Sequence, residues 1–360
     1  MSPRNLKALV LAGGTGTRLR PLTYTTAKQL VPVANKPILW YALDSLVSAG
    51  IRDIGIIISP ETGAAIEESV SRWKTADIKT TFIWQAQPLG LAHAVKTAQP
   101  YLQDSAFVMY LGDNLIQSEL LPMVENFRNS PADAHILLKA VENPKAFGVA
   151  ELNAQGQVVR LEEKPPNPQS DLALVGVYFF TPEVFEAIGK ISPSARGELE
   201  ITDALQMMIT MGKVIESHII QGWWLDTGKK DDLLQANRSV LDAFCTSNIQ
   251  AQVDTQSQIK GCVEIGTGTL VKNSQITGPV RIDKNCLIEN AVIGPYTSIA
   301  QGSKIIGTQI ENSVLLENCT LDHIPGRLDH SLMGQGCVLS KSPGTSHRFM
   351  LGDHAIVEIA

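Results

Sequence analysis

A glycine-rich turn near the start of the chain is the first segment whose residues could do chemistry. The apolar run Leu6–Leu11 passes directly into AGGTGTRLRP, residues 12–21. Glycines let backbone N–H groups approach phosphate oxygens closely, and a turn after a buried strand lies where α/β proteins bind ligands. The spacing fits neither G-x-G-x-x-G, which would need glycine at Leu19, nor a P-loop, because no G-K-[ST] follows. The turn indicates a phosphate site of another kind, with an ordinary tight strand-to-helix turn as the alternative.

Two aspartates follow apolar runs elsewhere in the chain. Asp113 comes after Phe107–Leu111 and Gly112, and Asp226 comes after a run that ends at Leu225. Two carboxylates brought together at the edge of a sheet suit Mg²⁺, which takes one or two protein carboxylates together with phosphate oxygens and water. Either aspartate alone could equally serve a turn or cap a helix.

The elements that must position these residues follow from the hydrophobic pattern. Strand-like and helical runs alternate in the first part of the chain, at Leu6–Leu11, Ile38–Ala49, Ile54–Ile58, Ala64–Ser71, Thr80–Trp84, Leu91–Ala98 and Phe107–Leu111. This βαβ rhythm is typical of a mainly parallel sheet covered on both faces. Strands separated by turns at Val149–Leu152, Val158–Leu161 and Leu174–Phe180 predict a mixed or antiparallel insertion. Helical patterns return at Ile201–Met211 and Asp231–Ala243, and the latter is expected to end the first domain.

The last third of the chain repeats. Aliphatic residues recur in steps of 6, 6 and 5, a period of 17 residues, from Ile259 through Ile276, Ile293 and Ile310 to Leu316. Small or β-branched residues such as Thr269, Cys286 and Ser303 follow many of them after four positions. This pattern resembles a left-handed parallel β-helix of hexapeptide repeats, with a sandwich of short strands as the alternative. The period fails from Asp322, and Ser342–Ala360 is expected to be a cap or docking tail. We therefore expect a catalytic domain over residues 1–244 and a β-helix domain with its tail over residues 245–360.

Composition excludes several classes of protein. The net charge of −6 argues against a nucleic-acid binder, because such proteins usually carry a basic face. No run approaches the roughly 18 apolar residues of a membrane span, and no signal peptide is indicated. The five cysteines form no C-x-x-C pair and fit neither a disulfide framework nor a zinc site, and the seven histidines show no ligand spacing. We expect a soluble, cytoplasmic protein.

Several motifs together resemble one family. LAGGTGTRLRPLT (residues 11–23) and KQLVPVANKP (28–37) closely resemble the signature of the sugar-1-phosphate nucleotidyltransferases, and within them of the glucose-1-phosphate thymidylyltransferases. QPLGLAHAV (87–95), YLGDNL (110–115), AFGVAEL (146–152), LEEKP (161–165), RGELEITDAL (196–205) and GWWLDTGKKDDLL (222–234) follow in the family's order. The C-terminal coil resembles the long form of the family. The resemblance implies an α/β fold with a Rossmann-like, GT-A-like mixed sheet and helices on both faces. The coil and this fold together predict a homo-oligomer.

The resemblance also implies a set of site residues. It implies that Arg18 and Lys28 are catalytic cations on the triphosphate and that Asp113 and Asp226 hold Mg²⁺. The nucleotide-binding residues that it implies are Leu11, Gly13, Gly14, Gly16, Thr17, Gln29, Gln85 and Gly90. Those for the sugar phosphate are Gly148, Glu163, Lys164, Gly176 and Arg196.

The implied reaction joins dTTP and glucose-1-phosphate into dTDP-glucose and pyrophosphate. The attacking phosphate is largely dianionic near neutral pH, its second pKa being about 6, so no strong general base is required. A uridylyltransferase that uses UTP and a nucleotide-sensing paralogue without catalysis are the alternatives. Acyl transfer by the coil is disfavoured because no histidine lies between Lys260 and Asp322.

Overall fold

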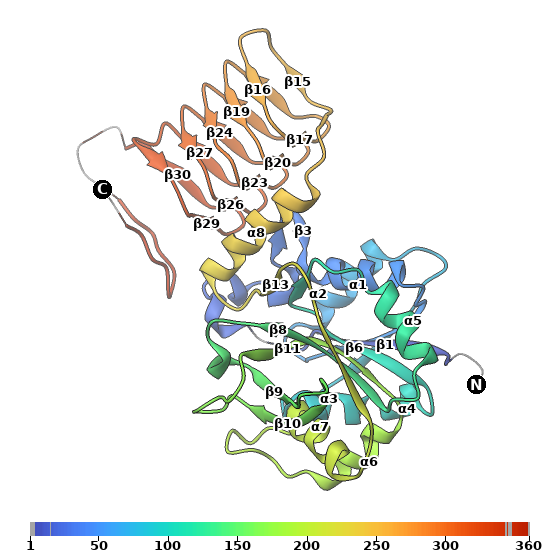
Figure 1. Ribbon diagram of the computed structural model, residues 1–360. Helices are drawn as coiled ribbons and strands as arrows, with labels where there is room; N and C mark the ends of the chain where they lie inside the picture. Colours follow the sequence, from blue (N-terminus) through green and yellow to red (C-terminus); the bar gives the residue numbers. More distant parts are fainter. Residues whose placement is uncertain (1–3, 15, 343, 345–347, 359–360) are drawn as a thin grey trace. The chain divides into compact units, whose positions relative to one another are not determined.

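The computed structural model describes residues 4–14, 16–342, 344 and 348–358 (Figure 1). Two compact units make up the chain. The first comprises Met1–Thr15, Thr26–Leu30 and Ile38–Asp226, and the second comprises Gly16–Thr25, Val31–Pro37 and Thr227–Ala360. Within the described ranges, no helix combines the length and apolar character needed to cross a membrane.

A nine-stranded mixed sheet forms the first unit. The strands β6, β1, β4 and β5 are parallel neighbours, as the βαβ pattern predicts. Beyond β6 the sheet becomes antiparallel through β11, which pairs with β6, β8 and β9, and β12 adds a parallel edge to β8. The predicted mixed insertion is thereby confirmed. The strands are β1 (Leu6–Leu11), β4 (Asp53–Ile58), β5 (Lys79–Trp84), β6 (Ala106–Leu111), β8 (Ala134–Ala140), β9 (Gly148–Leu152), β10 (Val158–Glu163), β11 (Leu172–Phe180) and β12 (Ile215–Ile219).

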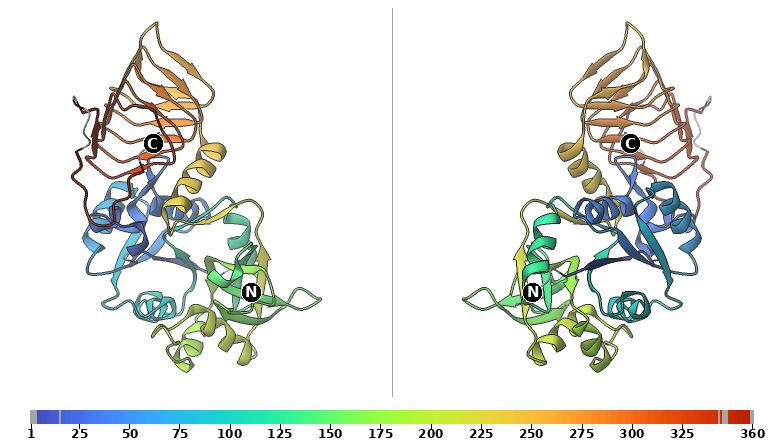
Figure 2. Two further views of the ribbon diagram at one scale, coloured as in Figure 1. Left: turned by 90° about the vertical axis from the view of Figure 1, so that its left-hand side faces the viewer. Right: turned by 90° about the vertical axis from the view of Figure 1, so that its right-hand side faces the viewer.

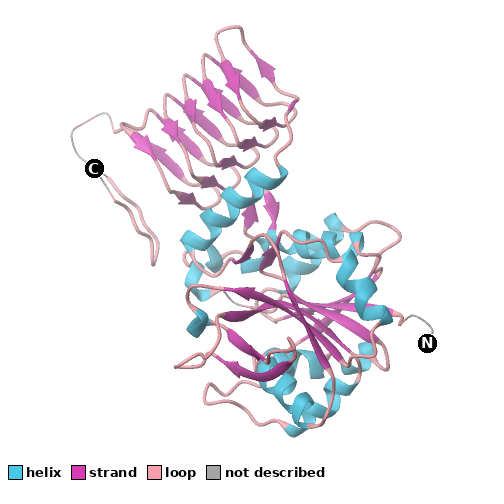
Figure 3. Ribbon diagram, in the orientation of Figure 1, coloured by secondary structure: helices cyan, strands magenta, loops and turns pink. Residues whose placement is uncertain are grey.

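Helices cover both faces of this sheet (Figure 3). Alternate residues of β1 divide between the two cores: Ala8 and Val10 pack on one side, Leu9 and Leu11 on the other. The first face carries α1 (Ile38–Ser48), α2 (Gly63–Trp73) and α5 (Leu121–Asn129). The second carries α3 (Leu91–Thr97), α4 (Gln99–Leu102), α6 (Glu183–Lys190) and α7 (Ile201–Thr210). The short 3-10 helices η3 (Lys28–Leu30) and η4 (Pro144–Ala146) complete the unit.

The second unit contains the coil of short parallel strands that the 17-residue period predicts (Figure 2). In register, Ile259 pairs with Ile276, then Ile293, then Ile310, so each aliphatic residue stacks on its counterpart one turn away. The small corner residues Thr269, Cys286 and Ser303 are buried. One wall comprises β14 (Asn248–Ile249), β17 (Val263–Ile265), β20 (Val280–Ile282), β23 (Thr297–Ile299), β26 (Val314–Leu315) and β29 (Leu332–Met333). The second comprises β15 (Gln252–Val253), β18 (Leu270–Lys272), β21 (Leu287–Glu289), β24 (Lys304–Ile306), β27 (Thr320–Asp322) and β30 (Val338–Ser340). The third comprises β16 (Gln258–Lys260), β19 (Gln275–Thr277), β22 (Val292–Ile293), β25 (Gln309–Ile310) and β28 (Arg327–Leu328).

One detail of the predicted coil was wrong. The residue that stacks on Ile299 is Leu315, not Leu316, because the last turns depart from the strict period. Leu316 instead belongs to a separate apolar cluster with Leu234 and Val314. Beyond Asp322 the strict period fails, as predicted, and the coil continues with turns of another length, since Leu328 pairs with Ile310.

The helix α8 (Lys230–Phe244) belongs to the second unit by its contacts. The side chain of Asn237 is buried, its Oδ1 accepting hydrogen bonds from the Ala34 N–H at 2.9 Å and the Ser298 hydroxyl at 2.7 Å. Its Nδ2 donates to the carbonyl of Tyr296 at 2.9 Å. This amide joins α8 to the coil and to the hairpin of β2 (Pro32–Val33) and β3 (Lys36–Pro37). We expected the first domain to end at residue 244, the last residue of α8, and this boundary stays a prediction.

Candidate active site

Three predicted residues of the first unit meet at one point. The ammonium of Lys28 lies 2.5 Å from Oδ2 of Asp113 and 3.6 Å from Oδ1 of Asp226. Lys28 is almost buried, whereas the two carboxylates are partly open. A cation and two anions, brought together from three distant segments, form a charged centre of the kind expected for binding and orienting phosphate groups.

Pairing between two short strands explains why the aspartates converge. The strand β7 (Asn114–Ile116) pairs with β13 (Trp224–Asp226), and Asn114 stands opposite Asp226. Because Asp113 directly precedes Asn114, the pairing places both carboxylates at the same end of the ribbon. Asn114 itself is buried; its Nδ2 donates to Oδ1 of Asp113 at 2.9 Å, and its Oδ1 accepts from the Trp224 indole at 2.6 Å.

The donor chemistry of this centre suits a divalent cation with a preference for oxygen. Two carboxylates with oxygens within 3.6 Å of one nitrogen can present oxygen ligands to a common ion. Such a set, with substrate phosphate oxygens and water completing the shell, is what Mg²⁺ takes in phosphate-processing sites.

The first glycines of the loop lie against a buried amide. A Cβ on Gly14 would lie 3.2 Å from Nε2 of Gln29, and one on Gly13 would lie 3.6 Å from the backbone nitrogen of Ser59. The Oε1 atom of Gln29 is buried and has no hydrogen-bond partner within the described part of the protein. A buried acceptor without a partner costs free energy, so this atom suits a ligand that donates a hydrogen bond.

Gln85 is held by a neutral histidine. Its Nε2 donates to Nδ1 of His93 at 2.9 Å, and the carbonyl of Gly90 lies at 3.4 Å. Burial and then the charge of Lys96 lower the pKa of His93, which favours the neutral ring that can accept this bond. Gly90 has φ of +102°, and a Cβ there would lie only 2.4 Å from the carbonyl oxygen of Leu199, so only glycine fits.

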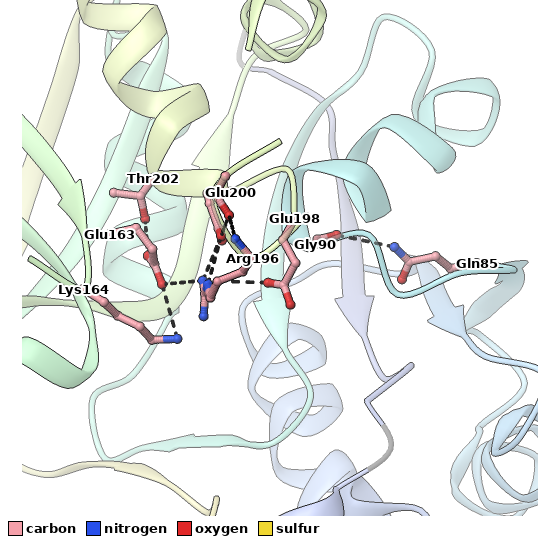
Figure 4. A network of polar contacts seen from close by, with 9 residues as sticks. Gln85, Gly90, Glu163, Lys164, Arg196, Glu198, Glu200 and Thr202 are labelled. Carbon is pink, nitrogen blue, oxygen red and sulfur yellow. Dashed lines mark hydrogen bonds and ion pairs between the residues drawn. The ribbon is translucent and has the colours of Figure 1, made fainter. Parts of the chain in front are cut away.

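The sugar-phosphate candidates form a second network in the same unit (Figure 4). The Glu163 carboxylate accepts a hydrogen bond at Oε2 from the hydroxyl of Thr202 at 2.7 Å, and its Oε1 lies 3.6 Å from the Lys164 ammonium. A Cβ on Gly148 would lie 3.0 Å from Oε2 of Glu163 and 2.8 Å from Oγ1 of Thr202. The glycine therefore leaves room beside the carboxylate. Lys164 has φ of +46°, a left-handed conformation that is uncommon outside glycine.

Carboxylates surround Arg196 in this network. Its Nη2 donates to Oε1 of Glu200 at 2.8 Å and to Oε1 of Glu163 at 3.2 Å, and its Nε donates to Glu200 at 3.2 Å. Glu198 lies 3.7 Å away. Burial lowers the pKa of Arg196, but the hydrogen bond and charge of Glu200 and the charges of the other carboxylates outweigh it, so the net shift is upward.

The remaining predicted residues are placed as follows. Leu11 packs in the core, and its carbonyl accepts from the Gly112 N–H at 2.9 Å. A Cβ on Gly176 would lie 2.6 Å from Cδ1 of Leu111, which accounts for the glycine by packing. Gly16, Thr17 and Arg18 belong to the second unit. There Gly16 has φ of +64° and precedes η1 (Thr17–Leu19), which η2 (Leu22–Tyr24) follows. The Arg18 guanidinium lies about 3.4 Å from the position of a Cβ on Gly228.

Four further residues support these groups, and of these the sequence indicated only that His93, in a helical run, packs near the site. Asn114 and His93 fix the orientation of Asp113 and Gln85, and Glu200 and Thr202 hold Arg196 and Glu163. The motif RGELEITDAL contained Glu200 and Thr202, and the period of α7 placed Thr202 on its buried side. No pattern in the sequence distinguished Glu200 from Glu198.

Comparisons with known proteins give the family. Residues 7–243 match the Nucleotidyl transferase family. A glucose-1-phosphate thymidylyltransferase of Streptomyces antibioticus is 48% identical over 98% of this chain and 99% of its own length. A glucose-1-phosphate thymidylyltransferase of Streptomyces griseus is 44% identical over 99% of this chain and 100% of its own length.

A solved structure is similar to part of the chain. A Bacillus anthracis protein named as a glucose-1-phosphate thymidylyltransferase is 35% identical, with a TM-score of 0.61 over 65% of this chain and 94% of its own. The Streptomyces relatives therefore match more of this chain than the solved structure does. The chain therefore belongs to the nucleotidyl transferase family, and its full-length similarity is to members named as glucose-1-phosphate thymidylyltransferases.

Proposed function

We propose that the chain transfers a thymidylyl group from dTTP to glucose-1-phosphate in a Mg²⁺-dependent reaction. The observation that carries this proposal is the convergence of Asp113 and Asp226 on Lys28, which follows the glycine-rich loop in sequence and precedes Gln29 in η3. The names of the two full-length relatives support the same activity.

The chemistry balances without a protein nucleophile. An oxygen of the sugar phosphate forms a bond to the α-phosphorus of dTTP, and the bond from that phosphorus to the bridging oxygen breaks as pyrophosphate leaves. The attacking phosphate is largely dianionic near neutral pH, so no proton has to be removed by a side chain. The protein contributes position and charge neutralisation, as in phosphoryl transfer generally.

Each group of the site has a role in this scheme. Asp113 and Asp226 would hold Mg²⁺, which supplies charge neutralisation on the phosphate oxygens. Lys28 and Arg18 are the cations for the triphosphate, with the loop's N–H groups as further donors. Their roles rest on the family resemblance and on the chemistry of the charged centre.

A second group would serve the sugar phosphate. Glu163, oriented by Thr202, accepts hydrogen bonds from sugar hydroxyls, and Lys164 and Arg196 neutralise the sugar phosphate. Gly148 leaves room beside the Glu163 carboxylate for this contact.

The site is expected to distinguish only modestly between thymine and uracil. Gln85, fixed by His93, offers one amide to a pyrimidine edge, and the methyl group that separates dTTP from UTP is worth roughly 1–3 kcal/mol. We expect dTTP to be preferred and UTP to be used more slowly. The rival is a uridylyltransferase, for which UTP would be the better substrate. A non-catalytic nucleotide sensor is disfavoured, because the full-length relatives are named as enzymes.

The test is a substrate panel. The protein is incubated with Mg²⁺, glucose-1-phosphate and each nucleoside triphosphate in turn while pyrophosphate release is followed. Release with dTTP faster than with UTP is expected. A faster rate with UTP would favour the uridylyltransferase, and no release with either would contradict the proposal.

A further inference from the structure

Two histidines and a glutamate, none of which has a part in the proposed function, gather at the free edge of the sheet. His135 lies on β8, and Glu216 and His218 lie on the edge strand β12. Glu216 stands directly opposite His135 in the parallel pairing, and His218 is two residues further along the same strand. In the part of the chain that the structure describes, this is the one group of three such residues with ligand atoms all within 4.8 Å of one another.

The contact between His135 and Glu216 is short without being a hydrogen bond. Nε2 of His135 lies 2.9 Å from Oε2 of Glu216, yet this buried nitrogen has no partner with hydrogen-bond geometry among the described residues. On its other side, Nδ1 of His135 lies 3.2 Å from Nε2 of His218. The two contacts use different nitrogens of the His135 ring, and a common ion would bind only one of them. With one ligand atom taken from each residue, the three atoms lie within 4.8 Å of one another.

These separations fit the edges of a coordination shell. Ligand atoms about 2.1 Å from a common metal lie about 3.0 Å apart at a right angle and about 3.4 Å apart in a tetrahedron. The 2.9 Å contact already has this spacing. His218 and Glu216 are only half-buried, so rotation about their side-chain bonds can close the wider separations. Two imidazoles and one carboxylate, with an open fourth position for water, are a ligand set that Zn²⁺ uses.

The surroundings keep the buried imidazole available as a ligand. The His135 side chain is completely buried, and the guanidinium of Arg4 lies 4.7 Å from the centre of the neighbouring Phe127 ring. Phe127 of α5 packs edge-on against the ring, with centroids 4.9 Å apart, and fixes its plane. Ser130 donates to Oε1 of Glu216 at 3.1 Å and leaves Oε2 for a metal. The positive charge of Arg4 opposes a cation here, and the carboxylate of Glu216 offsets it.

We propose that His135, Glu216 and His218 bind a divalent transition cation such as Zn²⁺, at a site distinct from that of Asp113 and Asp226. The cation would join the edge strand β12 to β8 through ligands from both strands. Mg²⁺ is a poor occupant, because it prefers oxygen ligands to imidazole nitrogen. The site needs neither dTTP nor glucose-1-phosphate, so metal binding there can be tested independently of the proposed function.

Cobalt(II) is the probe that tests the ligands directly. The full chain, treated with a chelator and then freed of it, is titrated with Co²⁺ and afterwards with Zn²⁺, while absorption and heat are recorded. We expect one equivalent of Co²⁺ to give visible ligand-field bands of nitrogen and oxygen ligation, which Zn²⁺ abolishes and excess Mg²⁺ leaves unchanged. A charge-transfer band of thiolate ligation, or no saturable binding, would overturn the proposal.

Variants assign the site. His218→Ala and Glu216→Gln alter half-buried side chains, so both are expected to fold, which circular dichroism checks. Each should weaken Co²⁺ binding by at least about tenfold. His330→Ala is the matched control, since His330 is an exposed histidine beside an aspartate, with Nδ1 2.8 Å from Oδ1 of Asp329. Binding by His218→Ala as tight as by the wild type, or loss of binding in His330→Ala, would refute the assignment.

Discussion

Replacing Glu200 by glutamine tests whether a buried carboxylate positions Arg196 for the sugar phosphate. Oε1 of Glu200 accepts from Nη2 and Nε of Arg196 at 2.8 and 3.2 Å and from the Ser194 hydroxyl at 2.7 Å. The Glu200 side chain is 5% exposed. Glutamine keeps the shape and removes the charge, so the guanidinium loses its fixed orientation.

The expected magnitude follows from the exposure of the two partners. Hydrogen bonds to charged groups contribute about 1.5–3 kcal/mol. Because the Arg196 side chain is 41% exposed and solvent screens the pair, we take the lower end. About 1.5 kcal/mol corresponds to roughly a tenfold fall in kcat/KM for glucose-1-phosphate.

Glu198→Gln is the matched control, because it removes the same charge from the same arginine. Oε2 of Glu198 lies 3.7 Å from Nη2 and its side chain is 40% exposed. An exposed pair of this kind contributes about 0.5 kcal/mol, so roughly a twofold change is expected. The assay measures initial rates of pyrophosphate release with each substrate varied in turn. Equal effects of the two variants, or a KM for dTTP raised as much as that for glucose-1-phosphate, would refute the positioning role.

Three further predictions follow from single features. Gly90→Ala should lower the free energy of unfolding by more than about 2 kcal/mol, because φ is +102° and the new Cβ would meet the carbonyl of Leu199. Gly156→Ala is the control: φ there is +79° but no atom lies near the new Cβ, so the free energy of unfolding should fall by about 1 kcal/mol. Equal urea midpoints of the two variants would contradict this prediction. Asn237→Ala removes three hydrogen bonds of α8, two of them buried, and should lower the free energy of unfolding by about 2–4 kcal/mol, whereas Gln235→Ala at an exposed position should be nearly neutral. A small loss of thermal stability for Asn237→Ala would show that other contacts hold α8. Chelation of divalent cations should stop pyrophosphate release and added Mg²⁺ should restore it, while continued turnover in chelator would remove the metal from the mechanism.

Periodic burial made most of the fold predictable from the sequence. The strand Leu6–Leu11 has its predicted bounds, and the helix predicted at Ile38–Ala49 runs over Ile38–Ser48, because buried strands and one-sided helices impose repeats that the sequence displays. The coil was predictable for the same reason, up to the turn at which Leu315 replaces Leu316 as the stacking residue. Leu315 and Leu316 are both aliphatic, so only the pairing with Ile299 decides which one stacks.

Contacts that depend on distant pairing could not be predicted in this way. The chain positions of Asp113 and Asp226 indicated strand ends, but the pairing of β7 with β13 that brings them together has only three residues a side. His135 and His218 are separated by 83 positions and meet only because β12 joins the edge of the sheet beside β8. Glu198 and Glu200 look alike in sequence, and only burial separates their contacts with Arg196.

The central claim is that the centre of Lys28, Asp113 and Asp226 catalyses transfer of a thymidylyl group to glucose-1-phosphate. The most direct measurement quantifies dTDP-glucose and pyrophosphate together, from dTTP, glucose-1-phosphate and Mg²⁺, for the wild type, Asp113→Asn and Asp77→Asn. Asp77 is the control because it is an exposed aspartate paired with Arg52. We predict equal amounts of the two products with the wild type and with Asp77→Asn, and a loss of both of at least about a hundredfold with a folded Asp113→Asn. Undiminished formation of dTDP-glucose by Asp113→Asn would contradict the account.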